Sequence, residues 1–390
     1  MINRSLFEDT ATAFTLKSDS ELERAYFLFR MISSEPLVRI GTAATNFALK
    51  AHLPVEKLIR ATVFDHFCGG VNEEDCLPVI DKLYTEGVSS VLDYSVEGKA
   101  EENQFDNALE KILKIIHFCD DREAMPIVVF KPSGFGRFLL YQKKTEGVEL
   151  SKEEEEEWQR IVIRFDKVCK LAQEKDVEVL IDGEESWMQD AADDLVEEMM
   201  CRYNKDVTVV YNTLQLYRWD RLDYLKGLHQ RAKENGFKIG MKIVRGAYME
   251  KERERALDKG YESPICENKK ATDDNFNDTL NYILNNLKDI SVFIGTHNEA
   301  SCFLAMDLME THNIAKQDNN VWFGQLYGMS DHISFNLAAQ GYNVAKYIPF
   351  GPVKDVMPYL IRRAEENTSV SGQTSRELTL LKTEKRRRKL

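Results

Sequence analysis

The stretch "KIGMKIVRGAY", residues 238–248, is a short apolar run that ends in an arginine and a glycine. Seven further runs of this kind occur along the chain, each followed by a helical pattern, and they begin at Ser90, Pro126, Val177, Thr208, Ile290, Asn320 and Asn343. Continuously apolar strands are typical of a parallel sheet that is covered on both faces. Eight strand–helix units match a (β/α)8 barrel of the α/β class better than an open sheet, with a doubly wound sheet as the alternative.

Composition bounds the class of protein. The chain has 390 residues, 43% of them hydrophobic and 30% charged, which is ordinary globular composition. Its formal net charge of -13 makes nucleic acid a poor partner. Seven scattered cysteines without a CxxC pair argue against a disulfide framework and a structural zinc site. Because no run approaches the ~18 apolar residues of a spanning helix, and no signal peptide is recognisable, we expect a cytoplasmic protein that is soluble or peripheral.

Three regions are expected from the pattern: an N-terminal helical region over 1–86, the barrel over 87–372, and a basic tail over 373–390. Within the barrel, Ser151 followed by Glu154 predicts a capping box at the start of a helix. The last nine residues, "KTEKRRRKL", carry six basic residues and one acidic residue. Two interpretations stay open for this tail, a disordered solubilising end and contact with anionic lipid head groups.

The active site of such a barrel lies at the carboxyl ends of its strands. Polar or charged residues stand at several of these ends, and the set comprises Lys131, Asp182, Gln215, Lys242 to Tyr248, His297, Leu326 and Tyr347. Each could be structural by itself, but a barrel brings the strand ends together on one rim. No GxGxxG, P-loop, GxSxG or HExxH motif is present. Metal binding by Asp182, Glu184 and His297 is conceivable, but we expect no metal.

The run from residue 238 has two unusual features. Gly246 and Ala247 interrupt it where a backbone approaches another group closely. Lys242 and Arg245 stand on either side of its last two strand residues, an arrangement that suits a flat anionic cofactor across the barrel mouth. A plain strand end followed by a charged helix is the alternative.

The second unusual stretch is "GPVKDVMPYLIRRAEENT", residues 351–368, which reads as a helix. One face carries polar groups at i, i+3, i+4 and i+7, namely Tyr359, Arg362, Arg363 and Glu366. The opposite face is an apolar stripe made of Met357, Leu360, Ile361 and Ala364. Helical geometry alone favours a solvated polar face, whereas a position after the eighth strand favours a face turned towards a carboxylate ligand.

The segments "DGEES", "YNTLQLY", "KIVRGAY", "GTHN", "QLYGM" and "YLIRRAEEN" together resemble the proline dehydrogenase family, over roughly residues 60–370. The resemblance implies a distorted (β/α)8 barrel with non-covalent FAD. It also implies oxidation of L-proline to Δ1-pyrroline-5-carboxylate by hydride transfer to flavin N5, with electrons passed to a membrane quinone. We therefore expect the first step of proline catabolism to glutamate, a separate pyrroline-5-carboxylate dehydrogenase downstream, and a peripheral place on the inner face of a membrane.

The same resemblance implies roles for individual residues. Arg362 and Arg363 would bind the proline carboxylate with help from Lys131, which suits the planar donors of guanidinium groups. The groups expected to enclose the ring or border the substrate are Ala247, Tyr248, Leu326, Tyr347, Tyr359 and Asp182, with Glu366 supporting the basic cluster. The expected flavin contacts are Gln215, Lys242, Val244, Gly246, Lys269, Thr296 and His297.

Two departures from the family pattern bear on the cofactor. Asn268 stands where some bacterial members have arginine, and Lys242 likewise replaces an arginine, which keeps the charge but loses the planar fork. Tyr347 is expected to disfavour a 4-hydroxyl group on the ring. Two other functions remain open: a flavin dehydrogenase of another cyclic amino acid such as 4-hydroxyproline, and a catalytically silent barrel that acts as a binding protein.

Overall fold

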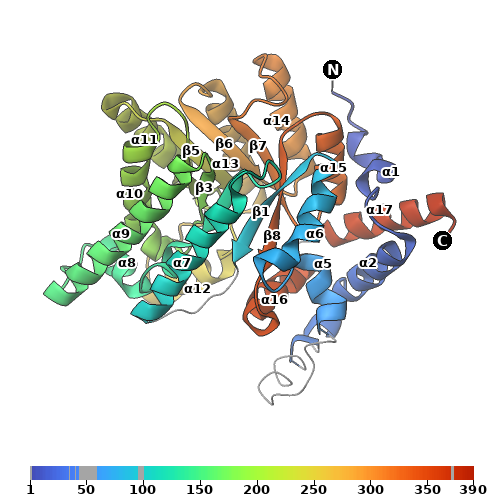
Figure 1. Ribbon diagram of the computed structural model, residues 1–390, viewed down its shortest axis with the longest axis horizontal. Helices are drawn as coiled ribbons and strands as arrows, with labels where there is room; N and C mark the ends of the chain where they lie inside the picture. Colours follow the sequence, from blue (N-terminus) through green and yellow to red (C-terminus); the bar gives the residue numbers. More distant parts are fainter. Residues whose placement is uncertain (1, 35, 40, 44–58, 95–100, 370–372) are drawn as a thin grey trace. The chain divides into compact units, whose positions relative to one another are not determined.

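Eight strands form one closed barrel in sequence order, β1 through β8 (Figure 1). The structure, a computed structural model, describes residues 2–34, 36–39, 41–43, 59–94, 101–369 and 373–390. Its strands are β1 Val88–Tyr94, β2 Ile127–Phe130, β3 Glu178–Ile181, β4 Val210–Gln215, β5 Ile239–Val244, β6 Ile290–Gly295, β7 Val321–Leu326 and β8 Val344–Phe350. All eight coincide with the predicted apolar runs.

The (β/α)8 prediction is confirmed, and the doubly wound alternative is wrong, because the first and last strands pair. Strand β1 runs parallel to β8, with Val88 opposite Val344 and Tyr94 opposite Phe350. Strands β2, β4 and β8 are buried at every position. Burial on both faces explains why these strands read as continuous apolar runs rather than as alternating ones.

The chain divides into two compact units, one over Gly98–Gly324 and the other made of Asn3–Glu97 with Gln325–Leu390. Helices of the first unit are α7 Glu102–Cys119, η3 Pro132–Gly134, α8 Phe138–Thr145, α9 Lys152–Glu174, α10 Ser186–Tyr203, α11 Arg221–Asn235, α12 Met249–Lys259, α13 Lys269–Asn285 and α14 Glu299–Thr311. Helix α9 begins with the predicted capping box, in which Ser151 and Glu154 each accept a backbone hydrogen bond from the other.

The second unit contains both ends of the chain. Its helices are η1 Leu6–Glu8, α1 Thr10–Ala13, α2 Asp19–Ile32, the π-helix η2 Arg60–Phe64, α5 Asp65–Phe67, α6 Glu73–Tyr84, α15 Asp331–Ala339, α16 Val353–Ser369 and α17 Gln373–Arg388. Part of the predicted N-terminal helical region, 44–58, lies outside the described residues. The boundaries expected at 86 and 372 stay predictions.

The basic C-terminal segment is a helix and not a disordered end. Helix α17 lies beside α2 (Figure 1), and its Leu380 and Leu381 are buried in one cluster with Leu22 and Phe29 of α2. Arg388 donates hydrogen bonds to the carbonyls of Phe14 and Lys17. The two leucines among the basic residues give α17 an apolar side, which explains its order. Lipid contact by this segment stays a prediction; none of the helices in the described ranges is long and apolar enough to cross a bilayer.

A buried histidine links α5 to the turn after β7 within the second unit. His66 Nε2 lies 3.0 Å from the carbonyl oxygen of Gly328 and donates to it. The rings of Phe67 and Phe29 pack edge-on against the imidazole, at 4.6 and 5.5 Å between centroids. Burial, assisted by the ammonium group of Lys17, lowers the pKa of His66 to about 3. The imidazole is therefore neutral in the folded protein at ordinary pH.

This depressed pKa predicts a loss of stability on the acid side. Below pH ~6.5 His66 becomes protonated in the unfolded chain but stays neutral in the folded chain. Folding stability therefore falls as the pH drops towards the folded pKa. His66→Gln keeps a donor but cannot titrate. We expect the stability advantage of the wild type over this variant to shrink by about 2 kcal/mol between pH 7.5 and pH 5 in urea unfolding. A difference that is constant over this range would contradict a buried, neutral His66.

Candidate active site

Two lysines share one carboxylate at the carboxyl ends of the strands in the first unit. Lys131 follows β2 directly, Asp182 follows β3 directly, and Lys242 lies within β5. Lys131 Nζ donates to Asp182 Oδ2 over 2.6 Å, and Lys242 Nζ donates to Asp182 Oδ1. The Lys242 side chain is 7% exposed, so this ion cluster is largely removed from water. The structure thus brings together three of the residues that the sequence singled out.

The protonation of this cluster follows from its geometry. Burial alone would raise the pKa of Asp182, but the ammonium groups of Lys131 and Lys242 outweigh it and hold the pKa at about 2. Asp182 is therefore a permanent carboxylate at physiological pH. Both ammonium groups lie at the strand ends that carry the predicted site, where positive charge favours an anionic ligand nearby.

A second carboxyl group fixes the loops that carry this cluster. Glu184 accepts hydrogen bonds from the backbone nitrogen of Ser133 at 2.8 Å and from its hydroxyl at 2.6 Å. Burial raises the pKa of Glu184 to about 7, although the Ser133 hydrogen bonds act against that rise. Because Ser133 and Glu184 each stand two residues beyond Lys131 and Asp182, this contact ties the two loops together. The sequence analysis did not predict this role of Glu184. The equal two-residue spacing that follows Lys131 and Asp182 could have indicated it.

The interruption of the fifth run at Gly246 has a definite cause. Gly246 has φ +122°, and a Cβ atom at this position would lie 2.3 Å from the ring of Tyr217, the second residue after β4. A side chain is therefore excluded both by conformation and by space. The predicted close approach exists, and Tyr217 is the approaching group. Beyond it, Ala247 is exposed and Tyr248 is half-buried at the start of α12.

The two basic residues of β5 do not act together. Arg245 donates to Asp273 Oδ1 at 2.8 Å, to Thr296 Oγ1 at 2.9 Å and to Ser301 Oγ at 3.1 Å. Its guanidinium also lies 4.5 Å from the ring centroid of Phe276. Residues three apart in an extended chain point to opposite sides, so Lys242 and Arg245 diverge. Arg245 binds Asp273 of α13 and Ser301 of α14, and the expectation that both basic residues face a cofactor stays a prediction.

The other expected flavin contacts have varied surroundings. Gln215 is buried and donates its amide to the carbonyl of Gly183 over 3.3 Å. Lys269 pairs with Asp273 and is largely exposed, and Thr296 accepts from Arg245. Val244 ends β5, and His297 is half-buried just after β6. Asn268 accepts a hydrogen bond from the backbone nitrogen of Ala271 as the N-cap of α13, which explains an asparagine at this position.

Two buried donors near Gly246 test whether a phosphate-bearing cofactor would fit. Within the described part of the chain, the hydroxyl of Tyr217 and Nη1 of Arg218 are buried and lack a hydrogen-bond partner. Residue 217 is fixed between neighbouring segments, because its nitrogen donates to Arg245 and its carbonyl accepts from Cys266. Unsatisfied buried donors are rare in folded proteins. A phosphate oxygen is one acceptor that would suit these two donors, while the other nitrogens of Arg218 bind Asp220.

The second unit holds the other predicted substrate residues. Leu326 packs against a buried cluster that contains Tyr359, Met357 and Leu360. Tyr347 is 9% exposed, and its carbonyl accepts a hydrogen bond from Tyr327 at 2.8 Å. The structure therefore sets Leu326 and Tyr359 in one apolar environment.

The polar row of α16 is not a plain solvated face. Tyr359 is 6% exposed and Arg363 is 8% exposed, and the guanidinium lies 5.0 Å from the Tyr359 ring centroid. Arg362 is half-buried. The side chain of Glu366 lies outside the described residues. Geometry on a helical wheel suggested a solvated row, and that interpretation is wrong for Tyr359 and Arg363, because Tyr359 packs with the apolar stripe.

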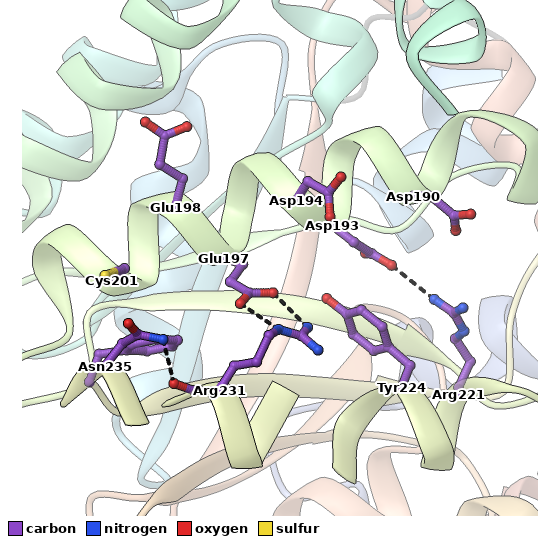
Figure 2. A pocket seen from close by; sticks show the side chains of 11 residues that line it. Asp190, Asp193, Asp194, Glu197, Glu198, Cys201, Arg221, Tyr224, Arg231 and Asn235 are labelled. Carbon is purple, nitrogen blue, oxygen red and sulfur yellow. Dashed lines mark hydrogen bonds and ion pairs between the residues drawn. The ribbon is translucent and has the colours of Figure 1, made fainter. Parts of the chain in front are cut away.

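The cleft between α10 and α11 is a different feature (Figure 2). It measures about 760 Å³ and lies on the outer helices of the first unit. Two ion pairs form within it: Arg231 donates to Glu197 at 2.7 and 2.8 Å, and Arg221 donates to Asp193 at 2.9 Å. We assign no chemistry to it, because none of the strand-end residues lines it.

Comparison with known proteins identifies relatives over most of the chain. A family model described as proline dehydrogenase matches residues 76–376. The chain is 37% identical over 322 residues to the carbapenem antibiotics biosynthesis protein CarD of Pectobacterium carotovorum subsp. carotovorum, covering 83% of each chain. It is 30% identical over 432 residues to the mitochondrial proline dehydrogenase 1 of Dictyostelium discoideum, covering 99% of this chain and 76% of that protein.

A solved structure shares the fold. Proline utilization A from Bdellovibrio bacteriovorus, inactivated by N-propargylglycine, superposes with a TM-score of 0.72 at 22% sequence identity. The match covers 92% of this chain and 38% of that protein, so this chain spans well under half of its length. At that identity the likeness concerns the barrel architecture alone.

The ion cluster predicts a large stability effect on removal of its carboxylate. Asp182→Asn removes the carboxylate that both lysines bind, and breaking a largely buried ion pair in this way typically destabilises a protein by about 3 kcal/mol. We expect this loss in urea unfolding, together with partial recovery when Lys242→Met is added. Asp274→Asn is the matched control, because it removes the partner of the exposed Lys270 and should leave stability near the wild-type value. Equal effects of the two asparagine variants would contradict this account.

Proposed function

The chain belongs to the proline dehydrogenase family, and from that premise we propose that it oxidises L-proline to Δ1-pyrroline-5-carboxylate with FAD as cofactor. This would be the first step in the catabolism of proline to glutamate. The observation that supports it best is the buried Lys131–Asp182–Lys242 cluster at the carboxyl ends of the strands. The two ammonium groups of this cluster suit a substrate that carries a carboxylate and a cofactor that carries phosphates.

The carboxylate of proline would bind Arg362 and Arg363, with Lys131 assisting. A guanidinium group offers two parallel donors to a carboxylate and stays charged at any physiological pH. The position of Arg363 over the Tyr359 ring supports this role, since stacking holds the planar group in one orientation. Leu326, Tyr347, Tyr359, Ala247 and Tyr248 would enclose the pyrrolidine ring, and Glu366 would support the arginines.

A bound flavin would supply, at its N5 atom, the two-electron acceptor for the hydride that leaves C5 of proline. The residues proposed to hold it are Gln215, Lys242, Val244, Gly246, Lys269, Thr296 and His297, to which we add Tyr217 and Arg218. The last two are included because their buried donors lack partners in the described chain. The protein's contribution would be orientation and electrostatics.

Loss of the amine proton has to accompany loss of the hydride from proline. Asp182 is a weak proton acceptor, because its two lysine partners hold its pKa at about 2. We propose instead that Asp182 positions Lys131 and Lys242. The amine proton would then leave to solvent, because a carboxylate with so low a pKa holds a proton poorly at the working pH.

The electrons would pass from the flavin to a membrane quinone, and a separate pyrroline-5-carboxylate dehydrogenase would use the product. A cytoplasmic location at the inner face of a membrane is part of the same proposal. It draws on the family resemblance and on the basic character of α17.

A spectroscopic experiment tests the proposal directly. The purified protein is expected to be yellow, with flavin absorbance near ~375 and ~450 nm. Anaerobic L-proline should bleach the ~450 nm band, whereas other amino acids should not. A colourless protein that also fails to take up FAD would indicate a silent binding barrel. A yellow protein that L-proline does not bleach would contradict the proposal and would favour another cyclic amino acid as the substrate.

Tyr347 predicts the preference between proline and its 4-hydroxylated analogue. A buried phenol beside the ring offers little room for an added hydroxyl group, and leaves that group without its water partners. We expect kcat/KM for L-proline to exceed that for 4-hydroxy-L-proline roughly 100-fold. Tyr347→Ser should narrow this ratio, with Tyr327→Phe as a neighbouring control. Comparable kcat/KM values for the two substrates in the wild type would overturn the assignment.

A further inference from the structure

The turn that joins β7 to α15 has a strained backbone. Gly328 has φ +79°, and a Cβ atom there would lie 2.3 Å from the carbonyl oxygen of His66. Ser330 has φ +51°, in the left-handed region that residues other than glycine rarely adopt. Such conformations persist only where surrounding contacts enforce them, and they concentrate at functional sites. This turn immediately follows Leu326.

One lysine makes several of the contacts that enforce this turn. Lys346 lies in β8 directly before Tyr347, and its side chain is fully buried. Its ammonium group donates to the carbonyls of Leu326 and Met329, and to Asp331 Oδ1 at 2.9 Å. The donors of one side chain thus reach both ends of the turn and the first residue of α15.

Other segments of the second unit complete the arrangement. Asp331 Oδ2 pairs with Lys17 Nζ at 2.9 Å, from the segment between α1 and α2. Glu377 of α17 accepts a hydrogen bond from the backbone nitrogen of Ser330 at 2.5 Å. The backbone nitrogen of Tyr327 donates to the carbonyl of Tyr347 at 2.8 Å. The turn is therefore fixed to β8 on one side and to the two terminal segments on the other.

We propose that Lys346 is a positioning residue for substrate binding, which holds the turn after β7 so that Leu326 and Tyr347 keep their places in the wall of the proline site. The inference rests on the proposed function, which places these two residues against the ring. A fully buried lysine is costly to desolvate, and an apolar residue of similar volume often gives equal or greater stability. A lysine is present at this position because its charge-assisted hydrogen bonds to two carbonyls fix the conformation of the turn.

Lys346→Met is the variant that tests this role. Methionine approximates the apolar stem and removes the donors, so the turn loses its contacts at Leu326 and Met329. We expect KM for L-proline to rise at least tenfold, while kcat changes less than threefold and the flavin spectrum is retained. Hydrogen exchange should be faster at the backbone amides of 326–331, a readout that does not depend on turnover.

Lys17→Met is the matched control. It removes the other cation from Asp331, but Lys17 makes no hydrogen bond to the turn carbonyls among the described contacts. We expect this variant to lose stability while KM stays within twofold of the wild type and exchange over 326–331 stays slow. Should Lys346→Met fold poorly, the combination of Lys346→Met, Lys17→Met and Asp331→Asn removes the three buried charges together and should still show the raised KM.

Each outcome decides the proposal. Wild-type KM together with wild-type exchange in the Lys346 variants would overturn it, and so would an equal rise in KM for Lys17→Met. A wild-type protein whose flavin L-proline does not reduce would instead count against the proposed function. In that case the exchange comparison still decides whether Lys346 holds the turn.

Discussion

Two largely buried carboxylates each bind a pair of lysines, and the arrangement of the strand ends depends on these contacts. Asp182 binds Lys131 and Lys242 in the first unit, and Asp331 binds Lys17 and Lys346 in the second. Strands that are apolar on both faces leave little water in their surroundings, so an isolated charge there is strongly disfavoured. Charges persist in such an interior when they are grouped and hydrogen-bonded. Both groups lie where strands end, and there they can serve ligand binding without interrupting the sheet.

The fold could be predicted from sequence because its signals are local. Eight apolar runs gave the eight strands, and the Ser151–Glu154 pair marked the start of α9 correctly. The sequence predictions failed where one local sequence pattern is compatible with two structures and tertiary packing selects between them. The charge of "KTEKRRRKL" suggested disorder, whereas Leu380 and Leu381 supply an apolar contact with α2. Likewise, the sequence around Arg245 does not indicate which way its side chain points. Only the alternation of side chains along an extended chain shows that Arg245 and Lys242 point to opposite sides.

The sequence predicted which residues belong to the candidate site better than it predicted the contacts between them. Position at the strand ends marked Lys131, Asp182 and Lys242, but nothing in the sequence stated that one carboxylate serves both lysines. The Lys17–Asp331 pair joins segments that lie about 300 residues apart, and Lys346 reaches back 15 to 20 residues to the turn before α15. Pairings over such distances have no local signature. A single lysine inside the apolar run of β8 was the available hint, since charge in a buried strand calls for a partner.

The division of the second unit between the two ends of the chain affects the order in which the protein can be made. Strand β1 cannot pair with β8, nor α2 pack against α17, until Gly98–Gly324 has been synthesised. At about 5–20 residues per second, the first segment waits on the ribosome for roughly 10–45 s. During that interval Leu22, Ala25 and Phe29, which α17 later covers, are exposed as an apolar surface on the nascent chain. Binding by a chaperone at this stage would therefore protect a segment that cannot complete its packing until α17 has been synthesised.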